Sequence, residues 1–186
     1  MISPTSPHQL FTITAFTENH VGMISKISAI FTRRCINVDS LVGSPSSIPG
    51  IHKFTITCHS DRRSMEKVVQ QIEKRVDVLR AFLYTDSDIV YQEVALYKVP
   101  SARLLEENRL EPLIRRHNAR IICINNEYTV LEKTGHERET EALFEELKEY
   151  GIRQFSRSGR VAITRSPVEY VDLFLEEEEK RRKNLG

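Results

Sequence analysis

The strongest constraint on the fold of this chain is an order of apolar periodicities that occurs twice. In the first half, strand-like segments with alternating or β-branched residues enclose two segments whose apolar residues recur every three or four positions, as in helices. The expected order is strand 10–17, helix 21–34, strands 36–42 and 51–58, a helix that starts at Asp61 or Ser64 and reaches Val76, and strand 78–84. This βαββαβ order predicts an α+β, ferredoxin-like unit, with two helices on one face of an antiparallel sheet.

The second half repeats this order from residue 89, so the sequence predicts two tandem ferredoxin-like units. The expected elements are strand 89–99, a helix interrupted or restarted at Pro112, a hairpin of strands 119–124 and 128–131, a helix from the capping box Thr134–Glu137 to Gly151, and a bent strand 152–164. The polar segment 85–88 is the expected joint between domains 9–86 and 89–166. We expect residues 1–8 to be disordered and residues 167–186 to form a charged terminal helix.

Composition argues against several classes of protein. Hydrophobic residues make up 40% of the chain, charged residues 28%, and the net charge is +1, so nothing demands a nucleic acid or an anionic membrane as partner. Apolar runs are too short for a membrane span, and the first residues lack a signal-peptide pattern. The three cysteines, Cys35, Cys58 and Cys123, form no C-x-x-C pair and are odd in number. They indicate buried thiols in a reducing compartment, and we expect the protein to be cytoplasmic.

Sequence patterns of catalysis and metal binding are missing. The six histidines are scattered without metal spacing, and no G-x-S-x-G, P-loop or G-x-G-x-x-G occurs, so we expect no catalytic residues, no metal and no cofactor in this chain. The segment Arg157–Arg160 contains two arginines that can grip a phosphate, although a bent strand end with exposed arginines is the simpler interpretation. An RNA-binding sheet needs aromatic residues on its central strands, and strand 51–58 offers only Phe54.

One loop has the chemistry of a small carboxylate site. Strand 10–17 stops at Glu18, and a helical pattern begins directly after Gly22, so the helix N-terminus presents free backbone N–H groups and the positive end of its dipole. Asn19 adds a side chain that can both donate and accept hydrogen bonds. Taken alone, the loop is explained more simply by a helix cap at Asn19 and a permissive turn at Gly22.

Three groups of residues carry a specific resemblance to a known family. They are Glu18-Asn-His-Val-Gly-Met23, the run from Ile30 to Leu41 with Ser44-Pro-Ser46, and, further on, Gln71–Leu79 and Arg157-Ser-Gly159. Together they resemble the small regulatory subunits of acetolactate synthase (acetohydroxyacid synthase), which have an N-terminal ACT domain, and the resemblance covers roughly residues 9 to 166. It implies a non-catalytic subunit that activates a separate catalytic (large) subunit. The catalytic partner is expected to hold thiamine diphosphate, Mg and FAD.

The resemblance also implies a regulatory role and a site. Members confer feedback inhibition by branched-chain amino acids, commonly valine, on the biosynthesis of valine, leucine and isoleucine. They form homodimers in which the effector loop of one protomer faces the second strand of the other. Position by position, Asn19 and Gly22 match the effector loop and Asn37 matches the residue that opens the second strand. The resulting candidate effector-binding residues are Asn19, His20, Val21, Gly22, Met23, Ile36 and Asn37.

Two positions depart from the family pattern, and two rival functions stay open. Cys35 stands where many members have glycine, and His20-Val21 replaces smaller polar residues, which bears on the helix end and on the choice of effector. Asn37 is also explained by a turn between helix and strand.

A free-standing ACT-domain sensor that regulates another enzyme or transcription is the main alternative function. A small acylphosphatase-like enzyme is a weaker one, because it needs a phosphate-gripping loop with a positioned asparagine.

Overall fold

A computed structural model describes residues 8–105 and 110–168, together with residues 171, 174, 176 and 180. The chain divides into two compact units, residues 1–90 with 162–186, and residues 91–161. Nearly all of the expected disordered segment 1–8, and most of the expected terminal helix 167–186, lie outside the described residues.

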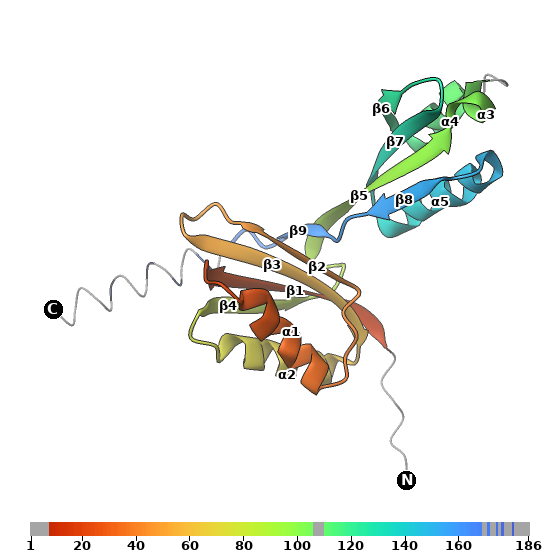
Figure 1. Ribbon diagram of the computed structural model, residues 1–186. Helices are drawn as coiled ribbons and strands as arrows, with labels where there is room; N and C mark the ends of the chain where they lie inside the picture. The colour runs from red at the N-terminus through yellow and green to blue at the C-terminus, as the bar shows by residue number, and fades with distance from the viewer. Residues whose placement is uncertain are drawn as a thin grey trace, which may run out of the picture. The chain divides into compact units, whose positions relative to one another are not determined.

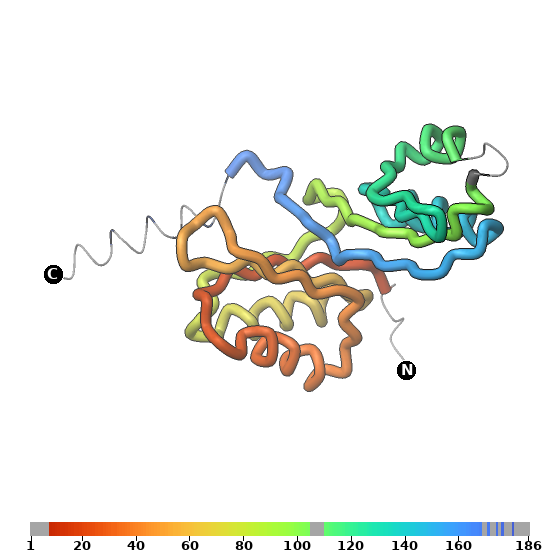
Figure 2. The backbone as a smooth tube through the Cα atoms, turned by 45° about the horizontal axis from the view of Figure 1, so that its top comes forward, coloured from red at the N-terminus to blue at the C-terminus, as the bar shows by residue number. Residues whose placement is uncertain are grey.

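The first unit has the expected ferredoxin-like topology. Its elements are β1 (Gln9–Glu18), α1 (Met23–Arg33), β2 (Ser40–Pro45), β3 (Ile51–Ser60), α2 (Arg62–Glu73) and β4 (Val78–Tyr84). The four strands form an antiparallel sheet in the order β2-β3-β1-β4. Both helices lie side by side on one face of this sheet (Figures 1 and 2).

The core of the first unit follows from the alternation of the strands. β1 and β3 pair in a register that sets Phe11 opposite Cys58, Ile13 opposite Ile56 and Ala15 opposite Phe54, and all six side chains are buried. The helical three- and four-residue spacing supplies the opposing layer, formed by Met23, Ile27, Ile30 and Phe31 of α1 and Met65, Val68 and Ile72 of α2. The apolar side chains of the strands and of the helices thus form one shared core, and the predicted fold is confirmed.

Two element boundaries in the first unit differ from the prediction. The expected strand 36–42 is displaced to Ser40–Pro45, because the Ile36 N–H is used by the helix end, donating to the Phe31 carbonyl at 3.1 Å. Gly43 continues the strand since it faces the Phe54 ring, where a Cβ atom would lie 2.6 Å from the ring. The second helix ends at Glu73, so Val76, expected on its apolar face, lies in the following turn and is 99% exposed.

The second unit repeats the topology with a longer first strand. Its elements are β5 (Ile89–Pro100), α3 (Ser101–Leu105), α4 (Leu110–His117), β6 (Arg120–Ile124), β7 (Tyr128–Gly135), α5 (Glu137–Leu147), η1 (Lys148–Tyr150) and β8 (Gln154–Arg157). The last strand, β9 (Val161–Thr164), begins at the end of this unit and continues into the first. The sheet order is β6-β7-β5-β8, and β9 pairs with β5 outside this path. Leu113, Leu143 and Leu147 of α4 and α5 pack with Ala95, Tyr97 and Val99 of β5.

The expected bent strand 152–164 is two strands, because Ser158–Arg160 interrupt the pairing. The capping residue of α5 is His136, whose N–H donates to the Glu139 carboxylate at 2.7 Å, whereas the expected Thr134 still belongs to β7. Pro112 lies in the first turn of α4, and residues 106–109 between α3 and α4, where the expected interruption would fall, are outside the described residues.

The cysteines agree only in part with the expectation of buried thiols. Cys58 is buried, and burial raises its pKa to about 12, so it remains a thiol at neutral pH. Cys35 and Cys123 are exposed, which corrects the prediction for these two residues. Within the described residues, no helix is both long and apolar enough to cross a membrane.

Candidate effector site

The loop between β1 and α1 is held from two sides by backbone hydrogen bonds. The Glu18 N–H donates to the Asp77 carbonyl at 2.9 Å, and the Asn19 N–H donates to the Gly50 carbonyl at 3.2 Å. The His20 N–H closes a tight turn onto the Glu18 carbonyl at 3.0 Å. The loop is therefore positioned by the turn before β3 and the turn before β4, which flank β1 because β3 and β4 are the neighbours of β1 in the sheet.

Gly22 is the N-cap of α1, and the first turn of this helix has no side-chain partner. Its φ angle is +84°, and a Cβ atom built there would meet no other atom within 4 Å. Within the part of the chain that the structure describes, no side chain caps the helix, and its first turn contains no acidic residue. The N–H groups that begin α1 are thus available to an anion, which the helix dipole favours. The interpretation of Asn19 as the helix cap is wrong, because the cap is Gly22.

An ion-pair network lies beside this helix end. Asp77 accepts a hydrogen bond from His20 Nδ1 at 2.9 Å and one from Lys26 Nζ at 2.5 Å. The Lys26 and His20 hydrogen bonds hold the pKa of Asp77 below its usual value, so it is an anion at neutral pH. Glu18, 3.6 Å from the His20 ring, completes a group of three possible metal ligands within 4.8 Å of one another. Because the Lys26 ammonium already binds the Asp77 carboxylate, we interpret these residues as an ion-pair network and not as a metal site.

Asp77 and Lys26 are neighbours of the loop that no sequence pattern predicted. Asp77 is separated from His20 by 57 positions, and in the sequence it stands out only as part of the Gln71–Leu79 motif. The signal that identifies it is the strand order, since β4 next to β1 places the turn before β4 against the end of β1. Lys26 lies one helical turn after Gly22, and its N–H donates to the Gly22 carbonyl at 3.0 Å.

The apolar candidates of the loop lie in different environments. Val21 is fully exposed and Ile24 is 56% exposed, so both present apolar surface beside the free helix end. Met23 is 4% exposed and packs in the core of the first unit. Val21 is therefore the loop residue whose side chain is accessible to the apolar part of a ligand or to a partner.

The remaining candidates, Ile36 and Asn37, lie at the other end of α1. This helix has 11 residues, which corresponds to about 16 Å. Within one chain, the loop residues 19–23 and the pair 36–37 are therefore separated by the full helix. The two groups therefore do not form one site within a single chain.

The end of α1 takes the turn that glycine usually provides, although Cys35 stands there. Cys35 has φ +53°, and its N–H donates to the Thr32 carbonyl at 3.0 Å while the Ile36 N–H donates to Phe31. This pair of bonds is a Schellman turn, which satisfies the last carbonyls of the helix. The departure from glycine at this position thus leaves the turn unchanged and adds backbone strain, because a left-handed conformation is unfavourable for cysteine.

The arginines of the 157–160 segment are not a phosphate grip. Arg160 is 3% exposed and its Nε lies 3.5 Å from the Glu93 carboxylate, so the expectation that both arginines are exposed is wrong. Arg157 is partly buried, and its guanidinium lies between Glu93, Glu137 and Glu141. Both cations are already paired with carboxylates, because Glu93 of β5 contacts both arginines and Glu137 and Glu141 of α5 contact Arg157.

Comparison with known proteins assigns both units. Residues 13–80 match the family described as AHAS small subunit-like ACT domain, and residues 92–166 match the family described as small subunit of acetolactate synthase. The acetolactate synthase small subunit of Bacillus subtilis (strain 168) is 30% identical over 154 residues, covering 82% of this chain and 89% of that protein. A probable acetolactate synthase small subunit from Methanothermobacter thermautotrophicus is 27% identical over 153 residues, covering 82% and 91%.

A solved structure agrees over most of the chain. The crystal structure of the acetolactate synthase small subunit from Thermotoga maritima superposes with a TM-score of 0.77 at 25% identity, covering 86% of this chain and 99% of that one. Topology, loop motifs and both family matches thus lead to one assignment. The chain belongs to the family of acetolactate synthase small subunits, with an N-terminal ACT domain followed by the C-terminal domain of that family.

Proposed function

We propose that this small subunit activates the catalytic subunit of acetolactate synthase and makes it sensitive to a branched-chain amino acid, with valine as the first candidate. The observation that carries the proposal is the uncapped N-terminus of α1 at Gly22, next to Asn19, in a domain of the ACT family. Among the described residues, no hydrogen bond is formed by the Asn19 side chain, so its amide is available to a ligand.

The site has a group for each part of an amino acid. The N–H groups after Gly22 receive the carboxylate, and the Asn19 side-chain oxygen accepts a hydrogen bond from the ammonium group. Val21 and the half-buried Ile36 supply apolar surface for a branched side chain. Asn37 supplies a second amide from the partner protomer. His20 and Met23 shape the loop, His20 through its bond to Asp77 and Met23 through its packing in the core.

This arrangement requires a homodimer through the first domain. One chain carries the two half-sites at opposite ends of α1, so a complete site needs the loop of one protomer and residues 36–37 of the other. We assign effector binding and dimerisation to residues 9–86 and regulation of the complex to residues 89–166. Thiamine diphosphate, Mg and FAD belong to the catalytic partner, which supplies the chemistry.

Feedback then follows from linkage between the two binding events. An effector can change the activity of the partner only if it binds two arrangements of the complex with different affinities. A tenfold change in the activity of the partner requires about 1.4 kcal/mol of differential binding. A few hydrogen bonds from the loop amides and Asn19 are sufficient for this amount.

Reconstitution tests the proposal. The purified chain is assayed with pyruvate alone, then with the catalytic subunit from the same organism, and then with valine, leucine or isoleucine added. The chain alone should give no acetolactate, the pair should be more active than the catalytic subunit alone, and one of the amino acids should inhibit the pair. Acetolactate formation by the isolated chain, or a pair unaffected by all three amino acids, would contradict the proposal.

A further inference from the structure

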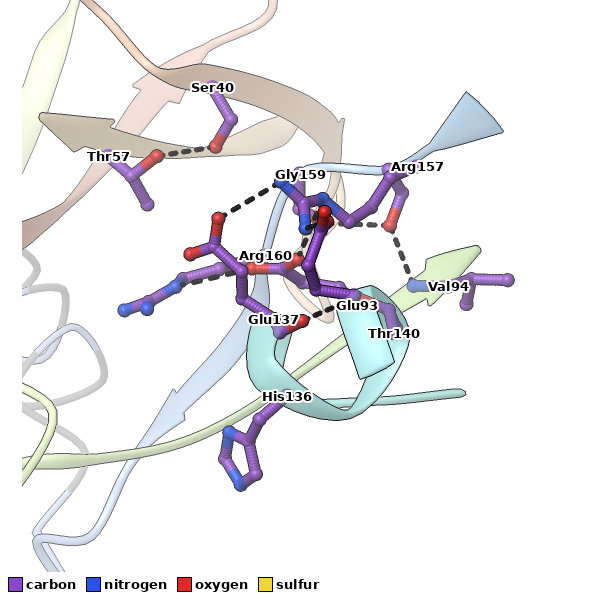
Figure 3. Close-up of polar contacts among 12 residues, drawn as sticks. Ser40, Thr57, Glu93, Val94, His136, Glu137, Thr140, Arg157, Gly159 and Arg160 are labelled. Carbon is purple, nitrogen blue, oxygen red and sulfur yellow. Dashed lines mark hydrogen bonds and ion pairs between the residues drawn. The ribbon is translucent and has the colours of Figure 1, made fainter. Parts of the chain in front are cut away.

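The second unit contains a buried ion-pair cluster that the effector site does not use. Glu93 of β5 is 6% exposed, and Arg160, which precedes β9, is 3% exposed. Two guanidinium groups converge on the Glu93 carboxylate, with Arg160 Nε 3.5 Å from one oxygen and Arg157 Nε 3.5 Å from the other (Figure 3). Burial raises the pKa of Glu93, an effect that the two arginines oppose. Charges removed from water in this way persist only when they are paired.

The cluster joins three elements of the second unit. Arg157 reaches the first turns of α5, with its Nη2 3.0 Å from Glu137 and its Nη1 3.6 Å from Glu141. The Arg160 guanidinium stacks on the Tyr91 ring with its Cζ 3.8 Å from the ring centroid. Tyr91 also makes an edge contact with His136, the capping residue of α5, at 4.4 Å between ring centroids. We define the Glu93 cluster as Tyr91, Glu93, Glu137, Arg157 and Arg160.

The Glu93 cluster lies where the chain enters and leaves the second unit. The unit begins at Tyr91 and ends at Val161. Tyr91 and Glu93 are thus at its entrance, and Arg160 is at its exit. A reciprocal pair of hydrogen bonds fixes the same two segments, because the Ser158 N–H donates to the Val94 carbonyl at 2.8 Å and the Val94 N–H donates to the Ser158 hydroxyl at 2.9 Å. Both chain connections are therefore joined to each other and to α5.

Stability alone does not explain this choice of residues. Replacing a buried ion pair by apolar residues is often neutral or stabilising, so such a pair is weak evidence for a purely stabilising role. Arginine also supplies a planar fork that can bind a carboxylate and stack on a ring at once, which lysine cannot do. One hydrogen bond is still missing, because the buried Arg157 Nη1 has no hydrogen-bond partner in the part of the chain that the structure describes. A shift of α5 by a fraction of an ångström would bring Glu141 within bonding distance.

We propose that Glu93 and Arg160 are positioning residues for feedback: their ion pair holds the two chain connections and α5 in the arrangement through which effector binding in the first domain reaches the catalytic partner. This inference rests on the proposed feedback function. Neither residue touches the effector or the reacting atoms. Their loss should therefore uncouple inhibition from effector binding and leave effector binding itself intact.

The test uses the full-length chain reconstituted with the catalytic subunit. Glu93→Gln, Arg160→Gln, the double variant and Arg160→Lys are compared with Arg153→Gln, which removes an exposed arginine from the same region. We expect both single glutamine variants to raise the amino-acid concentration for half-inhibition at least about tenfold, with effector affinity by calorimetry and activation within about twofold of the wild type. The double variant should match the single variants, since the two residues act as one unit. Arg160→Lys should restore inhibition only in part, and Arg153→Gln should change nothing.

A milder variant keeps the inference testable if Arg160→Gln does not fold. Glu137 is about half exposed, so Glu137→Gln removes a partner of Arg157 without leaving a buried charge, and we expect a shift of about threefold. Inhibition curves of folded variants that coincide with the wild type, multiplicative effects in the double variant, or loss of inhibition in proportion to lost effector binding would each overturn the inference. A wild-type complex that none of the three amino acids inhibits would instead overturn the proposed function.

Discussion

Replacing Gly22 by aspartate tests the anion site at the start of α1 directly. The substitution adds a carboxylate next to N–H groups that have no side-chain partner. The new group can bind these amides itself, as aspartate does at helix N-caps, and it repels an incoming carboxylate. Effector binding should therefore weaken through occupation and charge, while the fold and the activation of the catalytic subunit remain.

The structure sets the magnitude of each effect. A Cβ atom at Gly22 meets no atom within 4 Å, so no clash arises, and the left-handed backbone costs a side chain about 1–2 kcal/mol. Asp and Asn tolerate this conformation best, so we expect the lower value and a Tm decrease of about 4–8 °C. Repulsion between two carboxylates near 4 Å is about 1 kcal/mol in water and about 4 kcal/mol at an effective dielectric constant of 20. For this exposed loop, about 1–2 kcal/mol corresponds to roughly five- to thirtyfold weaker binding.

Gly22→Asn is the matched control, because it has the same size and the same backbone cost without the charge. Isothermal titration calorimetry with valine, leucine and isoleucine measures the affinity of both variants, and circular dichroism confirms their fold. We expect Gly22→Asp to bind at least about fivefold more weakly than Gly22→Asn. Equal losses in both variants would refute the electrostatic part of the reasoning, and an unchanged affinity of Gly22→Asp would show that the carboxylate is bound elsewhere.

Three further outcomes are expected. Cys35→Gly should stabilise the protein by about 0.5–1 kcal/mol in urea unfolding, because it relieves a φ of +53°, and a destabilisation would show that the cysteine side chain contributes more than the strain costs. A fragment ending at Asp88 keeps the complete βαββαβ core and should fold and dimerise, whereas feedback in the reconstituted complex should weaken; inhibition curves identical to the full chain would assign no role to the second domain. Because the pKa of Asp77 is lowered in the folded state, its contribution to stability is present above pH 4 and lost as the pH falls through the folded value. Asp77→Asn should reduce the loss of unfolding free energy at acid pH. An unchanged dependence of stability on pH would show that Asp77 makes no such contribution.

Local periodicity predicts most of the fold because the two cores are built from regular elements. Strand 78–84 and the helices at Leu113, Leu143 and Leu147 appear where their apolar spacing places them. β2 is displaced because its pairing with β3 overrides a local composition of glycine, serine and proline that favours a loop. Pairing between strands is a tertiary property, and a single segment does not reveal it.

The polar networks were the least predictable part. His20 and Asp77 are 57 positions apart, and Glu93 meets Arg160 only because β5 and the last strands of the second unit are neighbours. A charged residue has many possible partners along the chain, and the sequence does not show which one it meets. The arginines at 157–160 were therefore expected to be exposed, as unpaired charges usually are. The loop 19–22 was predictable because its donors and turn residue are adjacent in sequence.

Mixed dimers test most directly the proposal that each effector site is shared between two protomers. We expect Asn19→Ala and Asn37→Ala each to abolish effector binding and feedback as homodimers while activation of the catalytic subunit persists. A heterodimer of Asn19→Ala with Asn37→Ala keeps one complete composite site, whereas a heterodimer of wild type with the Asn19→Ala/Asn37→Ala double variant keeps none. Calorimetry on tagged heterodimers should therefore show one effector bound per dimer for the first and none for the second. The reverse result, binding in the second and not in the first, would place the whole site within one chain and contradict a site shared between protomers.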